Sequence, residues 1–305
     1  MPWNFISLMS VPGTAAFLPH VAEGIEASAN NEFRCLTQAN NGIGILSTRT
    51  GFVHGVGLTA PDIALMAATG TSLVWSPRSN VSLYGDTAAV ALYKRLGVNI
   101  AMGTDWTISG SMNMLRELRC ADGLNTTRFN NVLTDEDLWR IATVNGAKAT
   151  VTDTKLGRIA PSYLGDLAIY RRRQGVSFYR SIINAEPADV VLTMRAGKVL
   201  YGDANIVFGS AAPMCEQLTV CGRPKAACVQ TELPALTTGN NAGNTLALLQ
   251  QGNASTYPLF ACAEPAGDPT CVPERAATSP IGSNSKNGST TYTDMSTDTD
   301  KDGIA

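Results

Sequence analysis

The first half of this 305-residue chain predicts an α/β fold. Short apolar segments that suit buried strands alternate with segments that suit helices, which is typical of parallel βαβ units. Four such units follow one another between residues 13 and 124, and β-prone segments of another kind follow them. The sequence therefore predicts a parallel sheet, open or closed into a barrel, followed by a smaller β module.

The four expected strands are short and mostly apolar, and a helical segment follows each of them. The strands are GTAAFLPHV (13–21), GFVHGVGL (51–58), TSLVWSP (71–77) and NIAMGTDW (99–106). The helices run from Glu23 to about Asn40, over 60–69, over 86–97 and over 111–124. Pro61 in a first turn and Gly97 just after a helix suit those positions.

The second half begins with one more helix and then changes character. Thr134 is the expected N-cap of a helix over 134–150, with Asp137 at its third position. Segments 156–170 and 189–203 then have strand character. Beyond residue 210 the periodicity fades, and Gly, Asn, Ser, Thr and Pro become frequent.

Composition excludes several functional classes. A net charge of -2 gives no electrostatic footprint for nucleic acid. No apolar run reaches the ~18 residues that a membrane span requires. Residues 1–20 lack a basic region before their apolar stretch, so we expect no signal peptide there.

Every expected strand of the first half ends on polar residues. These are His20, His54, the segment 76–80, and Asp105, and the two histidines are the only ones in the sequence. In α/β folds, ligands bind at the carboxyl ends of the strands. Asp105 could instead cap the next helix, although Ser109 lies nearer to it. Four polar ends in succession favour one shared site over independent caps.

Together these segments resemble the second half of the metal-dependent amidohydrolases. The similar branch contains cytosine and guanine deaminases, adenosylhomocysteine deaminases and triazine hydrolases. The matching segments are HVAEG (20–24), VHGVGL (53–58), WSPRSN (75–80) with LYGDTAAV after it, and GTDW (103–106) with SGSMNML after it. The resemblance implies strands five to eight of a TIM-type (β/α)8 barrel, with part of a small β-sandwich after it.

The resemblance also implies roles for the residues at the strand ends. His20 would ligate a metal, and Glu23 would carry protons beside it. His54 would hydrogen-bond the substrate or the attacking hydroxide. Asp105 would ligate the metal and accept the proton of its water. Such a metal lowers the pKa of bound water toward ~7, and a nearby carboxylate can pass the proton to a leaving amine.

Four further residues would shape the substrate pocket, namely Trp75, Arg78, Asn80 and Trp106. The expected cofactor is a divalent metal, with zinc preferred and iron also suited to the ligands. The expected partner is a small-molecule substrate. The sequence leaves open whether a full-length parent forms a homo-oligomer. The family's first strand carries a His-x-His pair that this sequence lacks, so we expect a carboxyl-terminal piece of a longer protein.

The predicted organisation has four parts. A partial hydrolase barrel spans 1–152, a β-sandwich segment 153–210, a Cys-rich and largely irregular tail 211–293, and a truncated calcium-loop-like end 294–305. The leading hypothesis is a hydrolase of C–N bonds other than peptide bonds, deaminating or hydrolysing a small cyclic compound. The alternatives are a non-catalytic remnant and the scaffold of a secreted, calcium-dependent surface protein.

The tail concentrates cysteine and ends on alternating aspartates. Five of the seven cysteines lie between 215 and 271 at spacings that fit zinc modules poorly, so disulfides are expected. That favours a periplasmic or extracellular protein, with the cytoplasm not ruled out. The odd total indicates either a free cysteine, Cys35 or Cys120, or a missing partner. The segment DTDKDG offers Asp298, Asp300 and Asp302 as the opening of a calcium loop. An acidic tail without calcium is the alternative.

Overall fold

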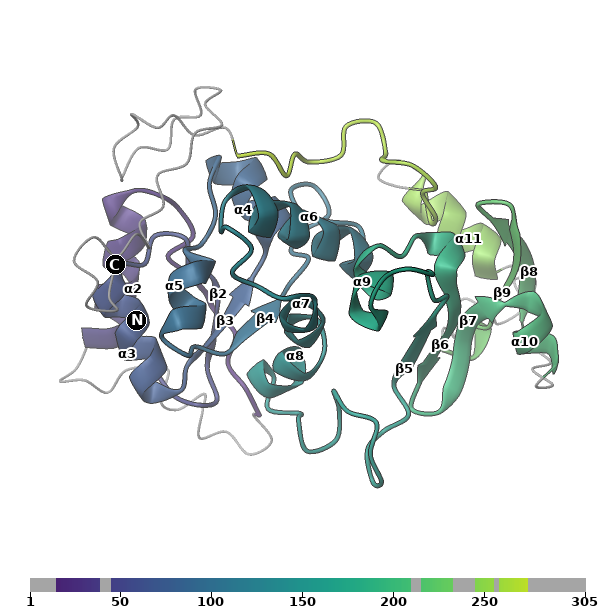
Figure 1. The fold of residues 1–305 in the computed structure, drawn as a ribbon, viewed down its shortest axis with the longest axis horizontal. Helices are drawn as coiled ribbons and strands as arrows, with labels where there is room; N and C mark the ends of the chain where they lie inside the picture. Colours follow the sequence, from purple (N-terminus) through teal and green to yellow (C-terminus); the bar gives the residue numbers. More distant parts are fainter. Residues whose placement is uncertain (1–14, 39–44, 210–214, 233–244, 255–257, 274–305) are drawn as a thin grey trace. The chain divides into compact units, whose positions relative to one another are not determined.

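The computed structural model describes residues 15–38, 45–209, 215–232, 245–254 and 258–273 (Figure 1). The chain forms two compact units, one of residues 1–158 with 269–305 and one of residues 159–268. None of the helices in the described part is long and apolar enough to cross a membrane. The expected calcium-loop residues Asp298, Asp300 and Asp302 lie outside the described residues.

The first unit is built on a four-stranded parallel sheet. Its strands are β1 (His20–Val21), β2 (Gly51–His54), β3 (Ser72–Trp75) and β4 (Ile100–Met102). They lie in the order β1-β2-β3-β4, and each neighbouring pair is parallel. A doubly wound sheet reverses its strand order at a switch point, whereas a barrel adds each strand at the same edge. The consecutive order therefore fits a partial barrel.

Seven helices are described in this unit, and Figure 1 shows those from α3 onward around β2, β3 and β4. They are α2 (Ala27–Gln38), α3 (Ala60–Thr69), α4 (Pro77–Tyr84), α5 (Val90–Arg95), α6 (Met114–Thr127), α7 (Asp135–Ile141) and α8 (Val144–Ala149). The expected alternation of strands and helices is confirmed. Fully buried Trp75, Tyr93, Phe33 and Phe52 are among the largest side chains of its core.

The structure differs from the expected elements in three places. Helix α4 is absent from the expected elements, because the sequence of 76–80 indicates only a polar strand end. Pro77 occupies its first turn, and Gly85, with φ of 70°, ends it. The helix expected over 134–150 is divided into α7 and α8, and Thr143 between them has a non-helical ψ of −96°. The first strand is reduced to β1, with one isolated bridge between Phe17 and Thr50.

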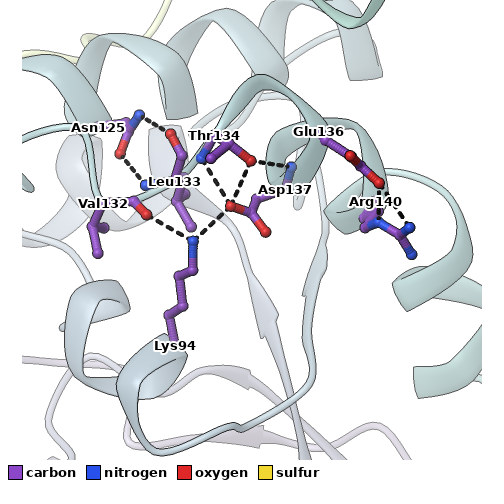
Figure 2. A network of polar contacts seen from close by, with 8 residues as sticks. All are labelled: Lys94, Asn125, Val132, Leu133, Thr134, Glu136, Asp137 and Arg140. Carbon is purple, nitrogen blue, oxygen red and sulfur yellow. Dashed lines mark hydrogen bonds and ion pairs between the residues drawn. The ribbon is translucent and has the colours of Figure 1, made fainter.

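Figure 2 shows the polar network that joins α5, α6 and α7. Thr134 accepts a hydrogen bond from the backbone N of Asp137, so the expected N-cap is confirmed. Lys94 binds the Asp137 carboxylate at 2.6 Å and the Val132 carbonyl at 2.7 Å. The side-chain amide of Asn125 makes two hydrogen bonds with the backbone of Leu133, one to its carbonyl and one from its N–H. These contacts satisfy backbone groups of the loop between α6 and α7 and one N–H in the first turn of α7.

The second unit is built on a five-stranded antiparallel sheet. Its strands are β5 (Leu167–Tyr170), β6 (Val190–Arg195), β7 (Lys198–Asp203), β8 (Glu216–Val220) and β9 (Arg223–Ala227), in the order β5-β6-β7-β9-β8 (Figure 1). Its helical elements are α9 (Phe178–Ile183), η1 (Pro187–Asp189), α10 (Ala204–Gly209), η2 (Gln230–Glu232) and α11 (Thr245–Asn253).

The β8–β9 hairpin lies in the tail that was expected to be largely irregular. Cys221 and Gly222 at its turn both have positive φ, as two-residue hairpin turns of type I′ require. A disulfide between Cys215 and Cys228 closes its other end. The sequence did not predict this hairpin, because lysine, proline and alanine in β9 hide its strand pattern.

Three disulfides confirm that the tail is cross-linked. They join Cys120 to Cys271, Cys215 to Cys228, and Cys221 to Cys262, and Cys35 is free and exposed. Disulfides of this kind are typical of proteins in oxidising compartments. One of them reaches from the tail into helix α6 of the first unit, where Cys120 is buried.

Candidate metal centre

His54 ends β2 with its side chain fully buried. Its Nδ1 lies 2.9 Å from Oδ1 of Asn80. The amide nitrogen of Asn80 donates to Thr87 Oγ1, which also accepts from Trp75, and this orients the Asn80 oxygen toward the histidine. His54 Nδ1 is therefore the donor, and its Nε2 carries a lone pair. That buried Nε2 has no hydrogen-bond partner among the described residues.

Two residues from the end of β1 converge on this nitrogen. His20, Glu23 and His54 each offer one ligand atom, and these atoms lie within 4.8 Å of one another. Oε1 of Glu23 lies 3.4 Å from His54 Nε2, and the two imidazole rings are 4.9 Å apart. The turn that presents Glu23 is fixed by Glu32, whose carboxylate accepts from the backbone N of Ala22 at 2.9 Å.

Asp105 approaches the same nitrogen from the end of β4. Its Oδ2 lies 3.7 Å from His54 Nε2. Asp105 does not cap the next helix, because the side chain of Asn113 accepts from the backbone N of Arg116 and caps α6. The cap interpretation of Asp105 is therefore wrong, and its side chain lies beside His54 instead.

The backbone is strained at each strand end that supplies this cluster. Ala22 (54°), His54 (76°) and Asp105 (56°) all have positive φ, which residues other than glycine rarely adopt. Such conformations persist only where the surroundings impose them, and they gather at functional sites. Gly55 follows His54 with φ of 58°, and a Cβ there would lie 2.6 Å from the Tyr93 hydroxyl.

Tyr84 is a neighbour of the cluster that the sequence did not predict. Its hydroxyl donates to Glu23 Oε1 at 3.0 Å. Burial, followed by the charge of Glu23, raises the pKa of Tyr84 well above its usual range, so the hydroxyl stays a donor. Tyr84 ends α4, and no sequence signal marked it because α4 itself was missed.

The four expected pocket residues have different surroundings. Trp75 is fully buried and packs edge-on against Phe129, so it belongs to the core. Arg78 is 6% exposed, and its guanidinium donates hydrogen bonds to Ser111 and to the Pro269 carbonyl. Asn80 lies behind His54, and Trp106 is 65% exposed beside Asp105. Of these four residues, Trp106 is the one with an exposed ring, and it directly follows Asp105 in the chain.

The donor set fits a divalent metal ion. His54 Nε2 is a buried lone pair with no hydrogen-bond partner, and a metal would satisfy it. His20, Glu23 and Asp105 add one nitrogen and two carboxylates around it. Imidazole and carboxylate together suit zinc and iron.

Comparison with known proteins gives a consistent picture. The Amidohydrolase family profile matches residues 15–200. A 5-methylthioadenosine/S-adenosylhomocysteine deaminase of Pyrococcus abyssi is 30% identical over 186 residues, which are 60% of this chain and 42% of that protein. The Clostridium tetani protein of the same name is 32% identical over 130 residues, or 42% of this chain and 30% of that protein.

Two solved structures are similar in fold. A zinc-bound adenosine deaminase from Xanthomonas campestris has a TM-score of 0.53 and 26% identity, covering 60% of this chain and 45% of that one. Escherichia coli guanine deaminase has a TM-score of 0.51 and 19% identity, covering 60% and 47%. The chain thus spans less than half the length of each of these relatives.

Proposed function

The chain belongs to the amidohydrolase family, and from this premise we propose that it is the carboxyl-terminal half of a metal-dependent deaminase of small cyclic compounds. The four parallel strands would be strands five to eight of a (β/α)8 barrel. Their consecutive order supports this assignment, as does the share of the relatives that the chain covers. The disulfides support a periplasmic or extracellular location.

The observation that carries the proposal is the convergence of His20, Glu23 and Asp105 on the Nε2 of His54, which has no hydrogen-bond partner in the described part of the chain. His20 and Asp105 would hold the metal, as expected. His54, for which the sequence predicts a hydrogen bond to the substrate or the hydroxide, would add its Nε2 as a third ligand. Bound there, the metal would act as a Lewis acid that makes water a nucleophile at neutral pH. Asn80 keeps His54 in the tautomer whose Nε2 can ligate.

Glu23 would move protons beside the metal ligands. Its carboxylate is partly open to solvent and touches His54, and Tyr84 holds one oxygen in place. The other oxygen would take a proton from water and give it to the leaving amine. The exposed ring of Trp106 beside Asp105 would contact a small planar substrate.

The two histidines make a direct test, because the sequence contains no others. Imidazole nitrogen NMR of the full chain should show both residues shifting together as zinc is added. Asp105→Asn should weaken zinc binding by about tenfold or more, since it removes a charged ligand. Asp166→Asn is the matched control, because Asp166 accepts a backbone bond in the second unit.

In the protein with a complete barrel, Glu23→Gln should lower ammonia release by about 10²–10⁴-fold with metal content nearly unchanged. Asp105→Asn should cost more than Arg78→Lys. Zinc that shifts neither histidine would overturn the metal centre and leave the non-catalytic alternative. Full turnover in Glu23→Gln would overturn the role of Glu23.

A further inference from the structure

A short segment of the tail contacts helices α4 and α6 within the first unit. We call residues 269–273 the strap. The Pro269 carbonyl accepts from Arg78 Nη1 at 2.5 Å, and the Pro273 carbonyl accepts from Arg128 Nη2 at 3.4 Å. Between these contacts, the disulfide from Cys271 to Cys120 attaches the strap to α6.

Arg78 connects the strap to the segment after Asp105. Its Nη1 donates to the strap, and its Nε donates to Ser111 Oγ at 2.8 Å. Its backbone N also donates to Glu117 Oε1 at 3.0 Å. A charge this deeply buried needs acceptors, and the guanidinium would lose the Pro269 carbonyl if the strap left.

Ser111 in turn closes the loop that holds Asp105. The backbone N of Ser111 donates to the Thr104 carbonyl at 3.1 Å, so residues 104 to 111 form a closed turn. The hydroxyls of Ser79 and Ser109 lie 2.9 Å apart and tie this turn to α4 a second time. The left-handed backbone of Asp105 is held inside the turn.

We propose that the strap positions Asp105, through Arg78 and Ser111, for metal binding at the candidate centre. Arg78 is then a positioning residue, which differs from its expected place in the substrate pocket. The disulfide makes the contact lasting, because Cys271 is 151 residues from Cys120 and two hydrogen bonds alone would hold the strap weakly. The metal part of this inference rests on the proposed function, whereas the ordering of the loop does not.

The test compares two disulfides in the full chain. The strap variant carries both Cys120→Ala and Cys271→Ala, which releases the strap. The matched control carries both Cys215→Ala and Cys228→Ala, which opens the β8–β9 hairpin. The strap variant should bind zinc about tenfold more weakly, and amides of residues 104–111 should exchange about tenfold faster. The control pair should change neither value.

Arg78→Lys keeps the disulfide and so tests the same path if the cysteine variant fails to fold. A lysine can reach Pro269 or Ser111 but has no planar fork for both, so it should fall between wild type and Arg78→Met in zinc affinity. A purely structural role would lower the melting temperature while zinc affinity and loop exchange stayed at wild-type values. That result would overturn the proposal.

The two proposals fail in different ways. If the wild type binds no zinc but amides 104–111 exchange faster in the strap variant, the metal centre is overturned and the strap's positioning role stays supported. Unchanged exchange alongside normal zinc binding would overturn the strap alone.

Discussion

Glu117 should make the first unit less stable as the pH rises toward neutrality. It lies on α6 with no exposed surface, and it accepts from the backbone N of Arg78. Burial raises the pKa of its carboxyl from 4.5 to about 7, although hydrogen bonds from Ser111 and Arg78 oppose the rise. Between these two values the folded state keeps a proton that the unfolded state has released. The free energy of unfolding should therefore fall across this window, by about 3 kcal/mol in total.

The sign distinguishes Glu117 from the other carboxylates with shifted pKa values. Burial tends to raise the pKa of Asp137, but hydrogen bonds from Lys94 and Thr134 outweigh burial and lower it. The Asp137 carboxylate therefore stabilises the fold at pH values above the usual pKa of an aspartate. That contribution is lost as the pH falls below 3.8. The two effects occupy different pH windows and have opposite slopes.

Urea unfolding followed by tryptophan fluorescence measures the effect in the first unit alone. All four tryptophans precede residue 159. Wild type should lose about 3 kcal/mol between about pH 4.5 and about pH 8, and Glu117→Gln should lose less than about 1 kcal/mol. Glu136→Gln, at an exposed pair with Arg140, should keep the wild-type slope. Parallel profiles for wild type and Glu117→Gln would refute the assignment of the slope to Glu117.

Changes at three further positions test local geometry. Thr134→Ala removes the cap shared with Asp137 and should cost about 1 kcal/mol of unfolding free energy, whereas Thr134→Ser should cost little; equal stabilities in urea would contradict the cap. Gly110→Ala places a Cβ 1.9 Å from the Thr104 carbonyl, so it should disorder the loop and weaken zinc binding. Gly123→Ala meets nothing within 4 Å in the interior of α6 and should stabilise the chain by about 1 kcal/mol, which calorimetry would measure.

The convergence at the candidate centre was predictable because a parallel sheet brings its strand ends to one edge. The sequence places His20, His54 and Asp105 at the carboxyl ends of three expected strands, and that placement alone predicts their proximity. The sequence favoured a site residue over a helix cap for Asp105, and the structure excludes the cap because Asn113 caps α6. The roles of these residues in catalysis stay predictions.

Sequence reasoning failed where side-chain direction mattered. Trp75 ends β3 as His54 ends β2, yet its indole packs in the core against Phe129. A strand buried on both faces shows no alternation that would tell the two directions apart. Tyr84 was missed for a related reason, since the eight residues of α4 carry a polar pattern that also suits a loop.

The strap shows a different limit. The spacing of the cysteines predicts cross-links but not connectivity, and it left Cys35 and Cys120 equivalent as the free thiol. What separates them is position on the fold, because Cys120 is buried on α6 whereas Cys35 is exposed on α2. A contact across 151 residues has no local signature, so only the folded chain reveals that Arg78 bonds to Pro269. The cysteines of the tail therefore do more than stabilise the tail itself. Cys271 keeps the Pro269 carbonyl beside Arg78, the residue proposed to position the Asp105 loop.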